Sequence, residues 1–497
     1  MLSMKNQNET AREAMMDEIT KGVREAFAFL CETPHGSGNE AALCGRLADR
    51  LRRDGYAPDC DEKGNLYCDL PASDGCADAP RVLLQAHLDM VCAVGSPDYH
   101  PETDPIRPIE RDGWLCTAGE SSLGADCGAG LAVMLWLAEH PAPGRPPIRL
   151  ICTVEEEIGL LGAREIPAER LADAAYLINL DGFRFGRMVV GAAGGLREHF
   201  TRPCPSAPAP ETPNGAAYRL TFSGFAGGHS GFDIGKKRAN AVLLMGELLR
   251  ELRMEVPFAL VSFAGGTAFN AIPYTCTAEL VTIAPARDVI ESLADKLCAR
   301  YAETEPEGRL TVEEIARPAQ VMDGGAASGL LTALGGFADG VYALHPETGA
   351  VADSSNLGHV YQADGQLCLD AMIRCVDGQA EQALHQSHQL VCGMCGFTGQ
   401  ITSRYSAWPA EGDSKLVSLL AQAYRARVGQ EPEISVQHVG LEPSFLREKN
   451  PNLQCVCIGM ELADCHSPQE RWKLDTVAPF VSMLSDTLTA LGADSAE

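Results

Sequence analysis

The sequence lacks the features that would place the protein in a membrane or on nucleic acid. It has no uninterrupted run of about 18 apolar residues, and residues 1–17 are polar and acidic rather than basic and then apolar. Basic residues are few: 40 lysines and arginines stand against 67 acidic residues, a net charge of -27 that repels phosphate backbones. We therefore expect a cytoplasmic protein that binds neither nucleic acid nor a membrane.

Low-complexity segments, glycine periods and internal repeats are also missing, which excludes extensive disorder and a fibrous fold. The chain of 497 residues is too long for one ordinary core and predicts two or three domains. Its 19 cysteines are scattered through apolar strings, as at Cys455 and Cys457, which indicates free thiols in a reducing compartment. Cys392 and Cys395 form a CxxC without a second pair, a weak zinc signal.

Three apolar runs in the first part of the chain end in groups suited to chemistry. Residues 81–86 lead to His87, residues 148–154 to Glu155–Glu157, and residues 175–180 to Asp181. Between the first two runs, Asp126 precedes an apolar helix at 131–138. Because sites in open α/β sheets lie beyond the carboxyl ends of the strands, these endings predict one shared site.

The middle of the chain follows another pattern. Residues 201–217 contain five prolines and indicate a loop or domain boundary, and the following strand and helix patterns predict an α+β region. From about Asp413 the earlier pattern resumes, and a buried strand at 456–459 runs toward His466. We predict an α/β catalytic domain in two parts, 1–195 and 406–497, interrupted by an inserted α+β domain at 196–405.

The candidate ligands each have an ordinary alternative. His87 and Asp89, two apart on a strand, face one side, so the carboxylate can orient the imidazole; the alternative is a surface histidine beside an acid. Asp126 lies among glycines at a strand-to-helix turn, where it bridges two cations or merely caps a helix. Cys127 is a second choice of ligand there.

Three adjacent acids, Glu155, Glu156 and Glu157, repel one another unless a cation or proton intervenes; the alternative is a solvated loop. In a metal site one glutamate binds the ion and its neighbour takes a proton from water. With Asp181 and His466, the set offers two histidines and three carboxylates, which suits two zinc-like cations with open positions for water.

A further set lies in the middle region. His229 stands among glycines and can approach a substrate closely, whereas Asn270 and Arg374 are natural partners of an oxyanion or a terminal carboxylate. The alternative is an ordinary turn and two surface polar residues.

In their order, the motifs resemble the signature of the aminoacyl-histidine dipeptidases, also called cytosol nonspecific or beta-alanyl-histidine dipeptidases, of the two-zinc aminoacylase and carboxypeptidase superfamily. The resemblance runs from residues 34–40 to Pro468. The motifs that carry it are His87-Leu88-Asp89-Met90-Val91, Gly124-Ala125-Asp126, Glu156-Glu157-Ile158-Gly159, Leu177-Ile178-Asn179-Leu180-Asp181, Gly227-Gly228-His229-Ser230-Gly231, Asn270-Ala271-Ile272-Pro273 and His466-Ser467-Pro468.

The resemblance implies a role for each of these residues. His87, Asp126 and Asp181 would hold one metal ion, and Asp126, Glu157 and His466 the other. Glu156 would be the general base and Asp89 the support of His87. A positively charged His229 would stabilise the oxyanion, and Asn270 and Arg374 would bind the carbonyl or carboxylate end of the substrate.

The implied activity is hydrolysis of dipeptides, Xaa-His and broader, by a bridging hydroxide that two divalent ions and Glu156 activate. Zinc is favoured, with manganese and cobalt as alternatives. The resemblance also implies the fold, an α/β catalytic domain with a mixed sheet and an inserted α+β lid domain. A homodimer would form through this lid domain.

The sequence departs from the family pattern at several positions. Gly182-Phe183-Arg184-Phe185-Gly186 replaces a serine and a run of acids, Cys127 replaces an asparagine, and Gln469 replaces an acid, although Glu470 remains. Pro443-Ser444 stands where cysteine and glycine are usual. No predicted ligand or base is lost, so we expect hydrolysis with altered specificity.

Two alternatives stay open. Arg184, in place of the acids, favours deacylation of N-acyl amino acids by the same metal chemistry. A noncatalytic metal-binding homologue is the other, although a scaffold needs no free glutamate beside its ligands.

Overall fold

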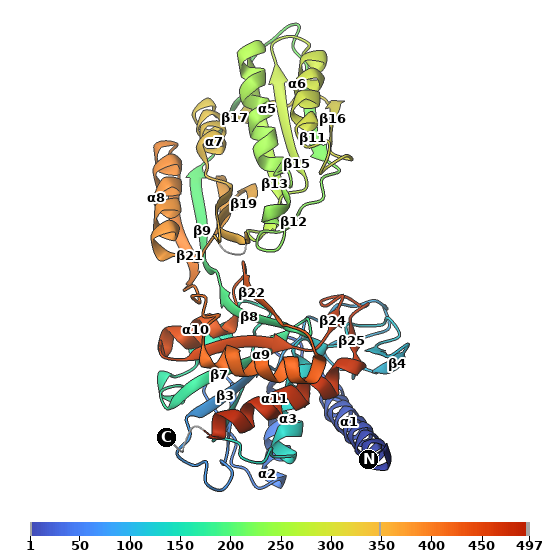
Figure 1. Ribbon diagram of the computed structural model, residues 1–497. Coiled ribbons are helices and arrows are strands. Elements are labelled where there is room, and N and C mark those ends of the chain that lie inside the picture. The colour runs from blue at the N-terminus through green and yellow to red at the C-terminus, as the bar shows by residue number, and fades with distance from the viewer. Residues whose placement is uncertain (1, 347–348, 494–497) are drawn as a thin grey trace. The chain divides into compact units, whose positions relative to one another are not determined.

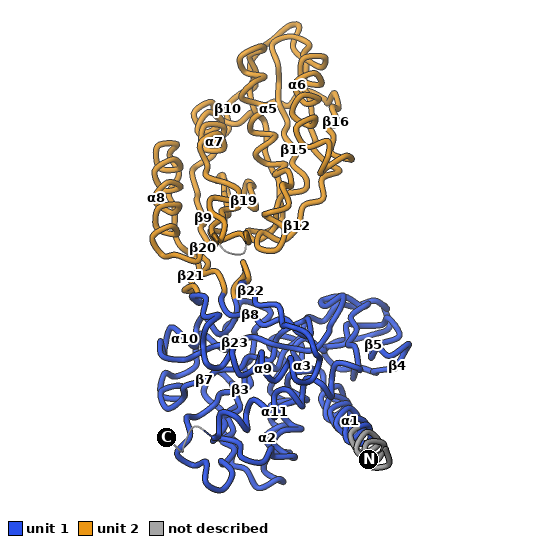
Figure 2. The backbone as a smooth tube through the Cα atoms, in the orientation of Figure 1, with its two compact units in different colours: residues 1–191, 408–436, 441–497 blue, residues 192–407, 437–440 orange. Residues whose placement is uncertain are grey.

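The computed structural model describes residues 2–346 and 349–493, and the chain forms two compact units (Figure 2). Unit 1 comprises residues 1–191, 408–436 and 441–497, and unit 2 comprises residues 192–407 and 437–440. Each unit has a large hydrophobic core of its own. The return of residues 437–440 to unit 2 was not indicated by the sequence.

Unit 1 is built on an eight-stranded mixed sheet with the order β1-β2-β6-β3-β7-β23-β8-β22. Strands β6, β3, β7 and β23 are parallel neighbours, so their carboxyl ends meet at one edge. Both β3 and β6 are almost fully buried, which explains their continuous apolar sequences. The strands are β1 (Asp59–Cys60), β2 (Leu66–Leu70), β3 (Arg81–His87), β6 (Ile148–Thr153), β7 (Ala174–Gly182), β8 (Arg187–Ala192), β22 (Glu433–Gln437) and β23 (Gln454–Gly459).

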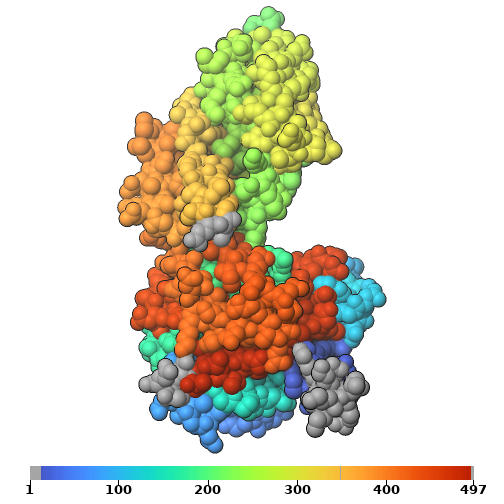
Figure 3. Space-filling model, in the orientation of Figure 1, coloured from blue at the N-terminus to red at the C-terminus, as the bar shows by residue number. Residues whose placement is uncertain are grey.

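Helices cover this sheet. Helix α3 is buried on nearly every side and packs against α1, β3 and β7, as expected of a helix that is apolar all round. Helices α9 and α11 pack against each other, and the C-terminal part of the chain, orange to red in Figure 3, covers one face of unit 1. The helices are α1 (Leu2–Cys31), α2 (Ala41–Arg53), α3 (Ala125–Glu139), α4 (Leu161–Glu165), α9 (Lys415–Val428), α10 (Glu442–Lys449) and α11 (Val477–Gly492), with 3₁₀ turns at Ala168–Arg170 and Leu474–Thr476.

A small sheet with the order β24-β25-β5-β4 completes unit 1. Its strands are β4 (Ile109–Arg111), β5 (Trp114–Cys116), β24 (Leu462–Ala463) and β25 (Arg471–Lys473).

Unit 2 contains an antiparallel sheet with the order β16-β11-β15-β13-β19-β20-β9-β21, to which β18 adds by pairing with β19 (Figure 1). The strands are β9 (Gly194–Pro203), β11 (Ala217–Ser223), β13 (Phe258–Gly266), β15 (Cys276–Thr282), β16 (Arg309–Glu314), β18 (Gly340–Leu344), β19 (Val351–Ala363), β20 (Gln366–Cys375) and β21 (Thr398–Tyr405). The helices are α5 (Ala241–Glu255), α6 (Arg287–Ala299), α7 (Gly324–Gly336) and α8 (Gly378–Met394), with a 3₁₀ turn at Ile234–Lys236.

Two short ribbons belong to unit 2: β10 (Ser206–Pro208) with β17 (Gln320–Met322), and β12 (Gly228–His229) with β14 (Ala271–Ile272). Strand β10 lies within the proline-rich segment that the sequence predicted to be irregular, which corrects that expectation locally. Proline is tolerated there because this strand pairs on one side only.

The mixed α/β sheet and the separate antiparallel α+β unit confirm the predicted fold class. All 19 cysteines are free, as their apolar surroundings predicted. In the described part of the chain, no helix combines the length and the apolar character needed to cross a bilayer.

Candidate metal centre and a polar cluster in unit 2

The predicted ligands of unit 1 lie together at one edge of the sheet. His87 ends β3, Glu156 and Glu157 follow β6, and Asp181 lies near the end of β7. Asp126 enters this edge from the first turn of α3, which begins after Gly124 with a left-handed φ of 71°. A Cβ at that glycine would lie 2.8 Å from the Met90 sulfur, so both space and conformation favour glycine.

Asp126 directs one carboxylate oxygen to each histidine. Its Oδ1 lies 3.1 Å from Nε2 of His87, and its Oδ2 lies 2.9 Å from Nε2 of His466. Among the residues that the structure describes, three sets of groups have ligand atoms within 4.8 Å of one another: His87, Cys127 and Asp181; His87, Glu156 and Glu157; and Asp126, Glu157 and His466. This is the arrangement of a carboxylate that bridges two ion positions.

Two buried oxygen atoms support the same interpretation. Oδ1 of Asp181 and Oε1 of Glu157 have no hydrogen-bond partner among the described residues. Oε1 of Glu157 nevertheless lies 3.0 Å from Nε2 of His466, as expected of atoms that point toward a common cation. Buried carboxylate oxygens need a partner, so the donor set fits two divalent cations.

The three adjacent glutamates have different surroundings. Glu155 forms an ion pair of 2.5 Å with Lys63, whereas Glu156 and Glu157 face the ligand groups. Burial, with the charge of Asp181 adding to it, raises the pKa of Glu156 well above its usual range. Its place among the ligand groups lets its carboxylate accept a proton and return it.

Asp89 supports the centre through atoms other than those expected. Its backbone oxygen lies 2.9 Å from Nδ1 of His87, whereas its carboxylate is 3.6 Å from that atom. The carboxylate instead accepts the backbone N–H groups of Glu156, at 2.9 Å, and Glu157, at 3.1 Å, and the hydroxyl of Ser37, at 2.8 Å. Asp89 therefore fixes the base and a ligand as well as the imidazole.

Glu470 is a residue whose part the sequence reasoning missed. Its buried carboxylate accepts the consecutive backbone N–H groups of Leu123, Gly124, Ala125 and Asp126 at 2.9 to 3.2 Å. It thereby fixes the loop that presents Asp126. A usable signal was its place two residues after Pro468, because the family pattern has an acid next to this motif.

A buried polar ladder lies one layer below the ligands. Gln85, which precedes His87 by two residues, accepts a hydrogen bond of 2.6 Å from Asn179, which precedes Asp181 by two residues. Nε2 of Gln85 donates to the Thr153 hydroxyl at 3.1 Å and to Oε2 of Glu442. The ladder thus joins the three ligand-bearing strands.

In unit 2, the backbone sets the tautomer of His229. Its Nδ1 accepts the N–H groups of Gly231, at 3.1 Å, and Phe232, at 3.3 Å, so Nε2 carries the proton of the neutral ring. Burial and the nearby guanidinium of Arg374 lower the pKa of His229 to about 4. This corrects the expected positive charge: near neutral pH His229 is a neutral hydrogen-bond donor.

Arg374 lies beside His229. Its Nε donates to the Ser230 hydroxyl at 3.3 Å and its Nη1 to the Tyr405 hydroxyl at 3.0 Å, while Nη2 lies 3.5 Å from Nε2 of His229. The arginine is only 4% exposed, so its orientation is fixed. Ser230 and Tyr405 were not predicted.

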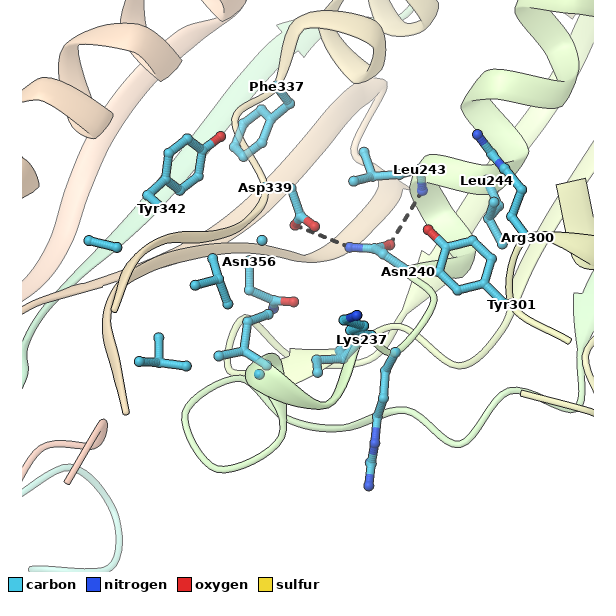
Figure 4. Close-up of a pocket in the computed structure, with 18 of the residues that line it drawn as sticks. Lys237, Asn240, Leu243, Leu244, Arg300, Tyr301, Phe337, Asp339, Tyr342 and Asn356 are labelled. Carbon is cyan, nitrogen blue, oxygen red and sulfur yellow. Dashed lines mark hydrogen bonds between the residues drawn. The ribbon is translucent and has the colours of Figure 1, made fainter. Parts of the chain in front are cut away.

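Asn270 belongs to the same cluster. Its backbone oxygen accepts the N–H of Ser230 at 2.8 Å, and the Asn356 amide donates to the carbonyls of Phe269, at 3.2 Å, and Ala271, at 2.9 Å. Asn356 also lines a cavity of about 1070 Å³ in unit 2 (Figure 4). Of the predicted ligand and substrate residues none lines this cavity, although Ile272, two residues after Asn270, does.

The segment 182–186, which departs from the family pattern, is also placed. Arg184 is half exposed and pairs with Glu433 at 3.0 Å, and the ring of Phe185 packs against Tyr424 and Phe480. Arg184 thus has an ion-pair partner that is not one of the predicted ligands.

Comparisons with known proteins give one consistent result. The model of peptidase family M20/M25/M40 matches residues 83–490. The cytosol non-specific dipeptidase of Escherichia coli (strain K12) is 28% identical over 480 residues, which cover 94% of this chain and 97% of that protein.

Solved structures agree in fold. The aminoacylhistidine dipeptidase of Vibrio alginolyticus aligns with a TM-score of 0.82 and 29% identity over 94% of this chain and 96% of its own. The aminopeptidase PepT of Bacillus cereus aligns with a TM-score of 0.57 and 16% identity over 95% of this chain and 98% of its own, a likeness of fold.

Proposed function

Because this chain belongs to peptidase family M20/M25/M40, we propose that it is a metal-dependent dipeptidase that acts on free dipeptides, Xaa-His among them. The observation that carries the proposal is Asp126, whose two oxygens face His87 and His466 within a set that includes a partnerless Asp181 oxygen. The similarity to dipeptidases over 94% of the chain favours dipeptides as substrates.

We assign the ligands as the resemblance implied. His87, Asp126 and Asp181 would hold one ion, and Asp126, Glu157 and His466 would hold the other. Zinc is the proposed ion because imidazole and carboxylate ligands suit it, with manganese and cobalt as alternatives. When bound, the two ions supply Lewis-acid chemistry that makes water more acidic and polarises a carbonyl group.

The residues of the chain then perform the remaining steps. Glu156 takes a proton from the attacking water and returns it to the leaving amine, which its place among the ligand groups favours. Nε2–H of His229 donates a hydrogen bond to the carbonyl oxygen on which negative charge develops. The neutral ring already carries this proton, so His229 need not be protonated to act as the donor. Asn270 and Arg374 bind the carbonyl or carboxylate end of the substrate.

The remaining proposals concern the setting of the reaction. We infer that the protein acts in the cytoplasm, and that unit 2 serves as a lid and as the contact surface of a homodimer.

The proposal is tested by amino-acid release from a panel of free dipeptides beside N-acetyl amino acids, with and without chelator. We expect chelator-sensitive cleavage of the free dipeptides. Cleavage confined to the acetylated compounds would support a deacylase, and silence on both with metal bound would support a noncatalytic homologue.

The assigned base is tested separately. Glu156→Gln should lower kcat by about 10²- to 10⁴-fold while metal content is unchanged. Glu155→Gln is the matched control, because Glu155 pairs with Lys63 instead of facing the ligands. Full turnover by a metal-loaded Glu156→Gln variant would exclude this mechanism.

A further inference from the structure

A histidine that the proposed mechanism does not use lies beside Arg374 in unit 2. His438 belongs to the short segment 437–440 that returns to this unit. Its carbonyl oxygen would lie 2.4 Å from a Cβ at Gly231, and the ring of Tyr405 would lie 2.7 Å from a Cβ at Gly440. The segment therefore packs between the His229 loop and the tyrosine that holds Arg374.

The ring of His438 has one satisfied and one unsatisfied nitrogen. Nε2 lies 2.7 Å from the Ser354 hydroxyl, whereas the buried Nδ1 has no partner among the residues that the structure describes. The residue is 9% exposed. Buried ring nitrogens ordinarily have a partner, so the lone Nδ1 indicates a group that is supplied from outside the chain.

The register of the sheet places Ser354, the hydrogen-bond partner of His438, opposite Arg374. Ser354 and Arg374 are direct partners across β19 and β20, so their side chains share one face. Burial first, and then the charges of Arg374 and His229, lower the pKa of His438 to about 3. His438 is accordingly neutral near neutral pH.

Arg374 has capacity left for a ligand. A guanidinium offers five N–H donors, of which Nε and Nη1 each use one on Ser230 and Tyr405. A carboxylate has two oxygen atoms and can therefore accept from the arginine and from a second donor at the same time. The α-carboxylate is common to free dipeptides and N-acyl amino acids, so this argument holds for either substrate class.

Resting on the proposed hydrolytic function, we propose that His438 is a substrate-binding residue that, together with Arg374, holds the carboxyl-terminal α-carboxylate of the substrate. The bound carboxylate selects the tautomer in which Nδ1 carries the proton and Nε2 accepts the Ser354 hydroxyl. His438 and Arg374 thereby select substrates with a free carboxyl terminus and direct the enzyme to the carboxyl-terminal end of a peptide.

Two substitutions separate recognition from structure. His438→Gln can keep a polar atom near Nε2, and hence the Ser354 contact, while it loses Nδ1. His438→Asn keeps a polar atom near Nδ1 and loses the Ser354 contact. His359→Gln is the matched control, since His359 lies in unit 2, is 28% exposed at its side chain, and pairs with Asp370 rather than with this cluster.

The assay compares L-Ala-L-His with its carboxyl-terminal amide. The wild type should prefer the free acid. His438→Gln should lower kcat/KM for the acid by about ten- to a hundredfold, because it removes a charge-assisted hydrogen bond to the substrate. This bond is present both in the bound substrate and in the transition state, so the loss should appear chiefly in KM. The amide should change by less than about twofold, and His438→Asn should retain more of the preference. Equal losses for acid and amide would reduce His438 to a structural role and overturn the inference.

A binding experiment keeps this inference distinct from the proposed function. Calorimetric titration of the full-length chain with L-Ala-L-His and with its amide should show preferential binding of the acid, lost in His438→Gln. If the wild type hydrolyses no dipeptide, the proposed substrate class fails, while this titration still decides the role of His438. A wild type that binds acid and amide equally would overturn the inference.

Discussion

At the scale of single residues, the candidate metal centre depends on carboxylates that are not themselves ligands. Glu470 accepts four consecutive backbone N–H groups around Asp126, and the Asp89 carboxylate accepts those of Glu156 and Glu157. These buried N–H groups would otherwise lack partners. Both carboxylates thus fix the backbone positions from which the ligand side chains extend.

We expect Glu470→Gln to weaken divalent-metal binding by about 10- to 100-fold, because a single amide oxygen cannot replace two carboxylate oxygens that accept four N–H groups. Competition with a chelating dye measures this affinity. The control is Gln469→Ala, a change at the exposed neighbouring residue. Unchanged affinity in Glu470→Gln would show that the Asp126 loop holds its position without this contact.

The buried neutral His438 predicts a pH effect on stability. Its pKa is lowered from 6.5 to about 3 in the folded chain, so between these values the unfolded chain binds a proton that the folded chain does not. Stability from this group is therefore present above pH 6.5 and is lost as the pH falls. At about pH 5 the loss is roughly 2 kcal/mol.

Urea unfolding of the wild type and of His438→Gln at pH 7 and about pH 5 checks this effect. We expect the wild type to lose more stability on acidification than the variant, by roughly that amount. Parallel losses would mean that the His438 ring is protonated in the folded chain.

At the scale of elements, three parallel strands determine the centre. Strands β6, β3 and β7 are adjacent and end at one edge, so residues far apart in sequence reach one volume. The buried ladder from Asn179 through Gln85 to Thr153 and Glu442 joins the same strands beneath the ligands. Its members lie on the ligand side of the sheet because side chains two apart share a face.

We expect Gln85→Leu to destabilise unit 1 by about 2–4 kcal/mol, since it leaves Asn179 and Glu442 buried without their partner. Thermal unfolding of the chelator-treated chain measures the change. Gln400→Leu is the matched control, as this glutamine is exposed on β21 of unit 2. A loss no larger than that of the control would show that the ladder contributes little to stability.

At the scale of the whole molecule, each unit has its own core, and all five predicted metal ligands belong to unit 1. A ligand that binds only a folded unit stabilises that unit by mass action. Bound metal should therefore stabilise unit 1 against unfolding and leave the stability of unit 2 unchanged.

Scanning calorimetry of the full-length chain should show two transitions, of which only one rises when zinc is added and falls with chelator. An excess of metal of about 100 times Kd should contribute roughly 2.7 kcal/mol to that unit. Gln85→Leu should lower the metal-sensitive transition, which identifies it as unit 1. A single transition that moves as a whole would show that the two units unfold together.

The sequence by itself determined the elements that carry the ligands and their order along the chain. The apolar runs that end in His87, in the glutamates and in Asp181 are local patterns of the sequence. In an open α/β sheet, parallel strands bring the carboxyl ends of such runs to one edge. The confirmed fold class follows from the same periodicities. Glycines around Asp126 and His229 likewise revealed close approaches that local sequence can record.

Only the tertiary structure decided which atoms support those residues. It separated Glu155, which pairs with Lys63, from Glu156 and Glu157, and it placed Glu470 against a loop 344 to 347 positions away in sequence. It also joined His438 to Ser354, the cross-strand partner of Arg374, and made His229 a neutral donor. The physical reason is that burial, hydrogen-bond partners and charge depend on neighbours in space, which long-range packing brings together and local periodicity does not specify.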